Sequence, residues 1–258
     1  KSTHDWVRSK FTDSGASATA LATGVKTNNN RIGVDTQNES VENVTEVAHK
    51  TGRSAGVVTS MAISHATPAS FTAHRVSRTD YEGIAQDMIT QTHLDVILGA
   101  GHPMFNDNGT ALSTEVILDS AGNVISSAPY YNYLGGAALF ESLKAGTAKN
   151  LDGSWTFIET LEDFNRYASL SSDSLPDRLI GIAPVHYTLQ SSRGVGPMKT
   201  DTIVNEHPKN TTVPHLKDMS LIALNLLNKN ENGFLLMIEG GAIDADAHES
   251  SIARIIEE

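Results

Sequence analysis

The sequence contains no cysteine, no long apolar run and no cluster of basic residues. The lack of cysteine excludes disulfide bridges, cysteine-ligated zinc sites and cysteine nucleophiles, and it leaves the cellular compartment open. A membrane-spanning helix needs roughly 18 or more consecutive apolar residues. The longest apolar stretch, 233–238, ends at Glu239, so we expect no membrane span.

Negative charge is in excess. The 258 residues include 19 Lys and Arg against 30 Asp and Glu, which gives a formal net charge of −11. Nucleic-acid backbones attract clustered Lys and Arg, so we expect no nucleic-acid binding. Hydrophobic residues make up 39% of the chain, which is enough for the core of one large domain, or at most two.

Short, continuously apolar segments alternate with helical patterns along the chain. Such segments are typical of strands that are buried on both faces, as in a parallel sheet covered by helices. We therefore predict an α/β fold: a doubly wound, mostly parallel central sheet with helices on both faces, a three-layer sandwich. The expected strands are 54–61, 94–100, 179–184 and 233–239.

Helices are predicted by apolar spacing and by capping residues. We expect one domain over 1–258, in which 105–210 is a less regular insert. The sequence ends on isoleucines at helical spacing (Ile252, Ile255 and Ile256) with no capping residue after them, so we expect a fragment that stops inside a helix. The other predicted helices are 14–24, 40–50, 80–92, about 137–145, about 158–168, and one that starts at Pro214.

Three polar clusters follow predicted strands or begin predicted helices, where ligands bind in such sheets. The first is the stretch 11–19, in which Asp13 precedes a helix of small residues and Ser14 opens it. The amides and the dipole of a helix N-terminus favour an anion, such as a phosphate or an alkoxide. The alternative is that Asp13 only caps the helix.

The second cluster, 64–70, follows the first predicted strand. In an extended segment the side chains of His65 and Thr67 would share a face and could converge on one ion. Arg78 follows, and its guanidinium could bind phosphate oxygens in a bidentate way. The alternative is an ordinary polar loop with a surface arginine.

The third cluster, 239–248, follows the last predicted strand and begins with Glu239 and two glycines. Asp244 and His248 are four residues apart, so they would lie on one helical face. Carboxylate and imidazole suit zinc, whereas carboxylate and hydroxyl oxygens suit magnesium. The alternative is an ion pair beside a buried strand. A weaker hypothesis is a zinc site that uses other histidines: His102, His186, His207 or His215.

Taken together, these motifs resemble the alkaline phosphatase family over nearly all of 5–258, least clearly at about 105–210. The nucleophile motif appears as FTDSGASAT and departs from the family pattern only at Phe11, where the family has an aliphatic residue. Four further segments occur in the family's order: ALATGVKTNNNRIGVD, HATPASFTAHRVSR, DVILGAG and MIEGGAIDADAHE.

The resemblance implies a metal-dependent phosphate monoester hydrolase with two Zn²⁺ and one Mg²⁺. Ser14 would be the phosphorylated nucleophile and a zinc ligand, Arg78 would hold the phosphate, and Asp13 would support both. His65 occupies a position where family members carry Asp or His, so the third ion could also be Zn²⁺. The remaining implied ligands are Thr67 and Glu239 for the third site, and Asp244 and His248 for one zinc.

The same resemblance implies small phosphate monoesters as substrates, inorganic phosphate as product, a homodimer, and a periplasmic or secreted location. The family's remaining metal ligands are not found in the sequence, which again indicates a fragment. We therefore expect the 258 residues alone to be inactive and prone to aggregation. Two other functions remain open: a phosphodiesterase or sulfatase-like relative of the same fold, and a non-catalytic phosphate- or metal-binding module.

Overall fold

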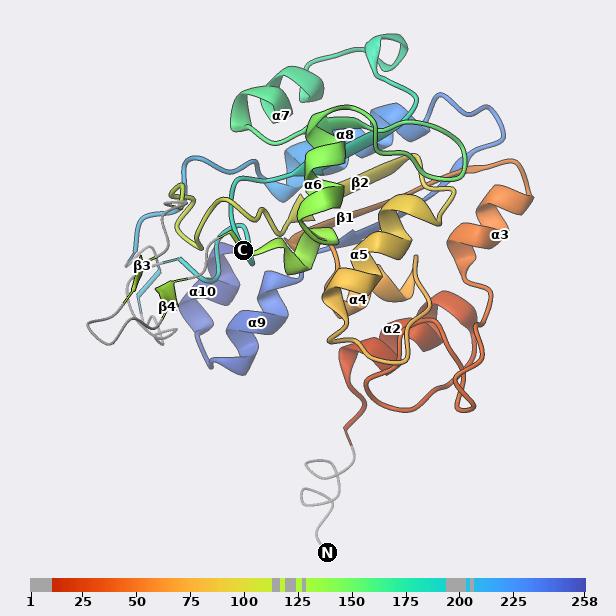
Figure 1. Cartoon of the computed structure of the whole chain (residues 1–258), viewed down its shortest axis with the longest axis horizontal. Coiled ribbons are helices and arrows are strands. Elements are labelled where there is room, and N and C mark those ends of the chain that lie inside the picture. Colours follow the sequence, from red (N-terminus) through yellow and green to blue (C-terminus); the bar gives the residue numbers. More distant parts are fainter. Residues whose placement is uncertain (1–10, 113–116, 119–123, 127–128, 194–202, 205–206) are drawn as a thin grey trace, which may run out of the picture.

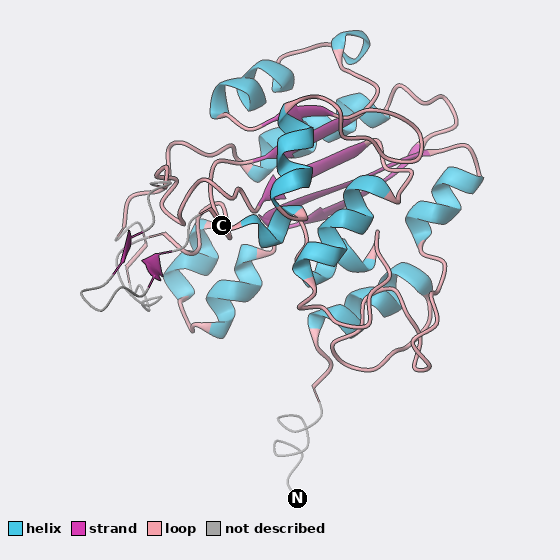
Figure 2. Cartoon of the chain, in the orientation of Figure 1, coloured by secondary structure: helices cyan, strands magenta, loops and turns pink. Residues whose placement is uncertain are grey.

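A central sheet of five parallel strands carries the fold, in the order β5-β6-β2-β1-β7 (Figure 1). The computed structural model describes residues 11–112, 117–118, 124–126, 129–193, 203–204 and 207–258. The strands are β1 (Ser54–Ala62), β2 (Val96–Ala100), β5 (Thr156–Ile158), β6 (Leu179–Ile182) and β7 (Phe234–Glu239). A separate antiparallel pair consists of β3 (Ile117–Leu118) and β4 (Val124–Ser126) (Figure 2).

Helices cover both faces of the sheet because successive strand residues point to opposite sides. Val57 and Ile97 belong to one apolar cluster, whereas Val58 and Leu98 belong to the other. The first cluster includes side chains from α3 (Val44–Lys50), α4 (Ala66–Ser70), α5 (Tyr81–Thr90) and α6 (Ala137–Lys144). The second includes side chains from α7 (Leu161–Ala168) and α8 (Leu216–Leu227). The predicted α/β architecture is confirmed.

Of the remaining helical elements, three lie before or after the sheet-forming segments and two short turns lie between its strands. They are α2 (Ser14–Thr23), α9 (Ala242–His248), α10 (Ile252–Glu257) and the 3₁₀ turns η1 (Tyr131–Leu134) and η2 (Ser172–Ser174). In the described part of the chain, α8 is the longest helix with 12 residues. No helix among these residues is long and apolar enough to cross a membrane.

Several predicted boundaries were wrong. The helix expected from about residue 158 begins at Leu161, because 156–158 form the short strand β5. The last helical segment is two helices, since Ser250 adopts a left-handed conformation (φ 59°) between α9 and α10. Ile252 and Ile256 are 71% and 67% exposed, so their helical spacing does not mark a packed face in this chain.

The helix of small residues packs as its composition predicts. Ser70 Oγ of α4 donates to the carbonyl oxygen of Gly15 in α2 at 3.1 Å. A Cβ atom at Gly15 would lie 2.8 Å from the carbonyl oxygen of Arg31, a distance that real Cβ contacts do not reach. The backbones of α2, α4 and the segment around Arg31 are therefore in close contact.

The direction of strand addition changes beside β1. The chain passes from β1 to β2 on one side, adds β6 and β5 beyond it, and then places β7 on the other side of β1. In open α/β sheets, ligands bind at such a switch point, outside the carboxyl ends of the strands. The fold therefore predicts a site where β1 and β7 end.

Candidate active site

A cavity of about 590 Å³ lies at this switch point. The segments after β1 and β7, the start of α2 and the loop that carries Arg78 all contribute to its wall. It brings together six of the eight predicted site residues, all except Thr67 and Glu239. The cavity is lined by Phe11, Thr12, Asp13, Ser14, Met61, His65, Arg78, Tyr81, Tyr187, Asp244, Ala245, His248 and Glu249.

Ser14 is the first residue of α2, and Asp13 is its N-cap. Asp13 Oδ1 accepts a hydrogen bond from the amide of Ala16 at 2.9 Å, which fixes the start of the helix. Ser14 is partly buried and lines the cavity. An anion bound beside Ser14 would lie at the positive end of the helix dipole. The alternative reading of Asp13 as a cap is correct, but its side chain does more than cap.

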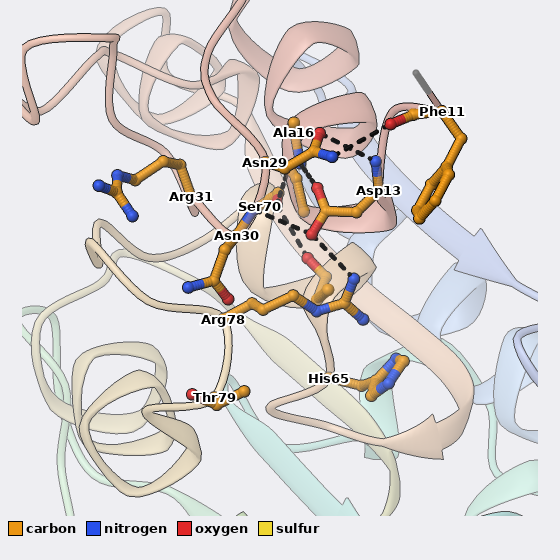
Figure 3. A network of polar contacts seen from close by, with 12 residues as sticks. Phe11, Asp13, Ala16, Asn29, Asn30, Arg31, His65, Ser70, Arg78 and Thr79 are labelled. Carbon is orange, nitrogen blue, oxygen red and sulfur yellow. Dashed lines mark hydrogen bonds and ion pairs between the residues drawn. The ribbon is translucent and has the colours of Figure 1, made fainter. Parts of the chain in front are cut away.

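The second oxygen of Asp13 holds the arginine (Figure 3). Asp13 Oδ2 accepts from Arg78 Nη1 at 3.1 Å and from the amide of Asn30 at 3.0 Å. The amide of Arg78 in turn donates to the carbonyl oxygen of Asn30 at 3.0 Å. The side chains of Asp13 and Arg78 are only 15% and 21% exposed. The guanidinium is therefore oriented by a charged, partly buried partner before any ligand binds.

His65 is a neutral imidazole on the wall of the cavity. Burial, and after it the positive charge of Arg78, lower the pKa of His65 to about 4, against the opposing effect of Asp244. At neutral pH the ring therefore keeps a lone pair available for an ion. Its Nε2 lies 3.3 Å from the hydroxyl of Tyr187.

The predicted extended arrangement of His65 and Thr67 was wrong. His65 is the N-cap of α4 and Thr67 lies in the first turn of this short helix. The Thr67 hydroxyl instead forms a hydrogen bond with the carboxylate of Glu239, the last residue of β7. Thr59 of β1 also donates to Glu239 Oε2, at 2.6 Å.

Glu239 is a partly buried carboxylate, and no cation among its described neighbours neutralises it. Burial raises the pKa of Glu239, the hydroxyls of Thr59 and Thr67 lower it, and the negative charge of Asp244 raises it further. A carboxylate and hydroxyl oxygens are ligands that suit Mg²⁺. These oxygens therefore fit a hard divalent cation, which would offset the cost of burying the charge.

Of the two glycines after β7, Gly241 occupies a position where only glycine fits. A Cβ atom there would lie 2.4 Å from Met61 Cγ and 2.8 Å from Glu239 Oε2. The backbone at Gly241 therefore lies too close to Met61 and Glu239 to leave room for a side chain.

Asp244 and His248 lie on the outer face of α9. His248 Nε2 is 3.6 Å from Asp244 Oδ2, and the two side chains are 77% and 62% exposed. The next acidic residue, Asp246, points inward: it is 2% exposed and its Oδ1 accepts from Ser191 Oγ at 2.6 Å. Asp246 thus anchors α9, while an imidazole and a carboxylate suited to zinc face the cavity.

Tyrosines also lie at the cavity, and none of the three polar clusters in the sequence predicted them. Tyr187 and Tyr81 line it, and Tyr133 bridges them, with ring centroids 5.9 Å and 4.9 Å from theirs. Tyr187 comes soon after β6, at the carboxyl end of a strand, and that position in a predicted sheet was the signal that could have found it.

The weaker hypothesis of a zinc site from the other histidines gains no support. Among the residues that the structure describes, none of the four belongs to a close group of metal-ligand side chains. His102 is buried, and its Nε2 pairs with Glu159 Oε2 at 3.0 Å. The only such group in these ranges lies at the amino ends of the strands, opposite the cavity, and consists of His49, His93 and Asp152.

Comparison with known proteins identifies the family. A family model described as alkaline phosphatase matches residues 1–258. The chain belongs to the alkaline phosphatase family. Alkaline phosphatase 4 of Bacillus subtilis is 32% identical over 245 residues, which cover 93% of this chain and 41% of that protein. The alkaline phosphatase of Escherichia coli is 28% identical over 261 residues, with coverages of 93% and 50%.

Solved alkaline phosphatases have the same fold. The enzyme from the Antarctic bacterium TAB5 matches with a TM-score of 0.62 and 26% identity, over 95% of this chain and 56% of that one. A TAB5 variant with one histidine replaced by aspartate, described with Mg bound in its M3 site, matches with a TM-score of 0.61 and 26% identity. It covers 95% of this chain and 55% of that one. The chain thus spans about half the length of these relatives.

Proposed function

We propose that the protein is a metal-dependent phosphate monoester hydrolase that acts through a phosphoserine at Ser14. The observation that carries this proposal is the position of Ser14 at the N-terminus of α2, in the same cavity as an arginine that Asp13 orients. Its substrates would be small phosphate monoesters and its product inorganic phosphate. The small-residue helix and the composition of the second cluster favour this reaction over that of a phosphodiesterase or sulfatase.

The reaction would proceed in two displacements. The Ser14 hydroxyl releases its proton to solvent as Oγ attacks phosphorus. The bond from Oγ to phosphorus forms as the bond to the ester oxygen breaks, and the leaving alkoxide takes a proton from solvent. Water then attacks the phosphoserine, which releases phosphate and restores the Ser14 hydroxyl. Arg78 donates its N–H groups to the phosphoryl oxygens in both steps. Charge-assisted bidentate hydrogen bonds from a planar guanidinium to phosphate oxygens are strong, so they stabilise the negative charge of the phosphoryl group as it is transferred.

The donor groups on the cavity wall fit the family's metals. Asp244 and His248 would hold one Zn²⁺, and Ser14 would contribute to the other. Zinc supplies a Lewis acid that favours the alkoxide form of a serine hydroxyl at neutral pH. Glu239 and Thr67 would hold the third ion; Mg²⁺ suits their oxygens, whereas the neutral imidazole of His65 would also accept Zn²⁺.

Two protein ligands are few for a zinc site, which normally has three or four. We therefore propose that the 258 residues expressed alone hold zinc weakly, are inactive and tend to aggregate. A homodimer and a periplasmic or secreted location are also part of the proposal, because the family resemblance implies them.

The test replaces Ser14 by alanine in the longest available form of the protein. We expect at least a ~10³-fold loss of p-nitrophenyl phosphate turnover, because the variant has no group to carry the phosphoryl intermediate. Acid quenching with labelled phosphate should trap a phosphoserine at Ser14 in the wild type. A phosphoserine at another position would contradict the proposal. Tight binding of phosphate without turnover in the wild type would favour the non-catalytic module.

A further inference from the structure

A second group of metal-ligand side chains lies at the opposite edge of the sheet from the cavity. His49 is in the last turn of α3, His93 precedes β2, and Asp152 precedes β5. One ligand atom from each of the three lies within 4.8 Å of the others. All five strands of the sheet are parallel, so these residues lie at the amino ends of strands. The nine residues of β1 separate them from the cavity by roughly 30 Å.

The three donors are arranged around one point. His93 Nδ1 lies 2.9 Å and 3.0 Å from the two oxygens of Asp152, and His49 Nδ1 lies 4.0 Å from Oδ2. Tetrahedral zinc with bonds of ~2.0–2.1 Å holds its donor atoms about 3.3 Å apart. The observed separations bracket this value, so rotation of the two imidazoles out of their stack would place all three donors on one ion.

The two imidazoles are already stacked. Their ring centroids are 3.5 Å apart and the rings are 9° from parallel. Both Nδ1 atoms face the carboxylate of Asp152. A lone pair on nitrogen lies in the plane of its ring, so the two rings tilt apart at their Nδ1 edges when both bind one ion.

The turn that carries Asp152 is fixed to the segment that carries His93. Asn150 is 5% exposed, and its Oδ1 accepts from the amide of Asp152 at 2.9 Å. Its Nδ2 donates to the carbonyl oxygen of Leu94 at 2.8 Å. Because one buried asparagine ties both segments together, the separation of His93 and Asp152 does not depend on a bound ion.

Solvent reaches the group. The side chains of His49, His93 and Asp152 are 42%, 32% and 26% exposed, which leaves room for a water molecule as a fourth ligand. Arg178 Nη2 lies 4.0 Å from Asp152 Oδ2, beyond hydrogen-bond distance, and its charge weakens the attraction for a cation. We therefore expect micromolar affinity.

We propose that His49, His93 and Asp152 form a zinc site that is separate from the catalytic cavity. The two imidazoles are ligands of borderline softness, and together with one carboxylate they suit Zn²⁺ rather than Mg²⁺ or Ca²⁺. The bound ion ties α3 to the segments before β2 and β5. Because it binds the folded chain, it stabilises the amino edge of the sheet without taking part in the reaction.

The experiment measures metal binding and thermal unfolding of the protein in its longest available form. Co²⁺, a spectroscopic substitute for Zn²⁺, is titrated into a chain in which Asp244 and His248 are replaced by Asn, which removes the cavity's exposed ligands. We expect one equivalent that the variants below lose, with the visible absorption bands of a four-coordinate nitrogen and oxygen site. Zn²⁺ at about 100 times its Kd should raise the unfolding midpoint by roughly 5–10 °C.

Two single changes in this background identify the ligands. His93→Asn should lower the Co²⁺ affinity at least tenfold and abolish the zinc-dependent shift of the midpoint. His49→Gln should do the same while the hydrogen bond between His93 and Asp152 remains, so it separates metal binding from a structural pair. His215→Asn, a change of an exposed histidine outside the group, is the matched control and should leave both values unchanged.

The proposal is overturned if His49→Gln and His93→Asn bind Co²⁺ as tightly as the background chain, or if that chain binds none. In the longest available form of the protein, His49→Gln should leave phosphate monoester turnover unchanged at saturating metal. Unchanged turnover would show that the zinc site is separate from the catalytic centre. The metal-binding measurements do not depend on the proposed function, so they would stand even if the protein were not a phosphatase.

Discussion

On the α2 side of the cavity, both carboxylate oxygens of Asp13 have protein partners, whereas on the α9 side Asp244 and His248 face each other and solvent. Arg78 shares the first environment: its side chain is 21% exposed, against 77% for His248. The arginine is thus oriented by the chain itself. The α9 pair is placed by the helix and, among the described residues, is held only by the contact between Asp244 and His248.

This difference shows which part of the site the sequence alone can preorganise. Groups that are fixed before the reaction stabilise charge without reorganising when it develops. Exposed ligands are free to adjust to an ion, at the cost of ordering them when it binds. We therefore expect the α2 side to keep its geometry without metal and the α9 side to depend on it.

The largest expected effect comes from the α9 side. In the longest available form of the protein, Asp244→Asn should remove one zinc per chain and lower turnover roughly 10²–10³-fold, because the Lewis acid is lost. The metal-free stability should change by less than about 0.5 kcal/mol, since the side chain is exposed. Elemental analysis, turnover and urea unfolding measure these values. A large loss of metal-free stability would show that α9 is held as tightly as α2.

Arg78→Lys tests the preorganised side. Lysine keeps the charge but loses the bidentate fork. The activation free energy for kcat/KM should therefore rise by about 1–3 kcal/mol, and inorganic phosphate should inhibit less. Steady-state kinetics with phosphate as the inhibitor measures both. Arg31→Lys, which changes an arginine that contacts Asn38 and the Val76 carbonyl instead, is the control and should leave both unchanged. Unaltered phosphate inhibition in Arg78→Lys would mean that this guanidinium does not hold the phosphate.

His65→Asp should change the preference of the third site by about tenfold from Zn²⁺ toward Mg²⁺, because a carboxylate is a harder ligand than imidazole. The measurement is activity after chelation and addition of each metal at graded concentrations. Tyr187→Phe is a useful companion, because it removes the hydroxyl beside His65 without changing the donor set. Equal Mg²⁺ dependence in wild type and His65→Asp would place His65 outside that site.

The smallest effect should come from the support behind the α2 side. His74 Nε2 pairs with Glu46, and its Nδ1 contacts the Gly33 carbonyl oxygen at 2.6 Å. The hydrogen bond with Glu46 raises the pKa of His74 from 6.5, and the same bond lowers the pKa of Glu46 from 4.5. The pair's stabilisation is therefore complete between about pH 4.5 and 6.5.

It should be lost as pH rises through the raised pKa of His74, and also as pH falls through the lowered pKa of Glu46. Glu46→Gln should therefore cost at most about 1 kcal/mol near pH 5.5, after allowance for solvent screening, and less at pH 9. Urea unfolding at both pH values measures the difference. A cost that does not depend on pH would show that the pair contributes packing rather than charge.

The sequence predicted the sheet better than the cavity. The strands at 54–62, 96–100 and 234–239 were found within two residues because they are continuously apolar. The strand β5 was missed because three residues carry no periodic signal. The break between α9 and α10 was missed as well, because a serine with positive φ occupies a position where glycine is the usual signal.

For the site, local motifs predicted which residues line the cavity but not how they contact each other. The hydrogen bond between Asp13 and Arg78 spans 65 positions, and the contact between His65 and Tyr187 spans 122. Spacing along the chain contains no information on such contacts. Thr67 interacts with Glu239 rather than sharing a face with His65, because α4 begins at Ala66 and Thr67 is therefore helical. The spacing of His65 and Thr67 did not predict that helix.

The contact between Gly15 and the carbonyl oxygen of Arg31 has a consequence for directed evolution. Even one added methyl group at position 15 would force the backbones apart, and the neighbouring Ala16 and Ala18 are buried as well. A library that randomises 15–18 and is selected only for folded protein, with no demand for turnover, should therefore still return glycine at position 15 and small side chains at 16 and 18. Part of the sequence beside Ser14 that looks like a signature of chemistry is thus a signature of packing.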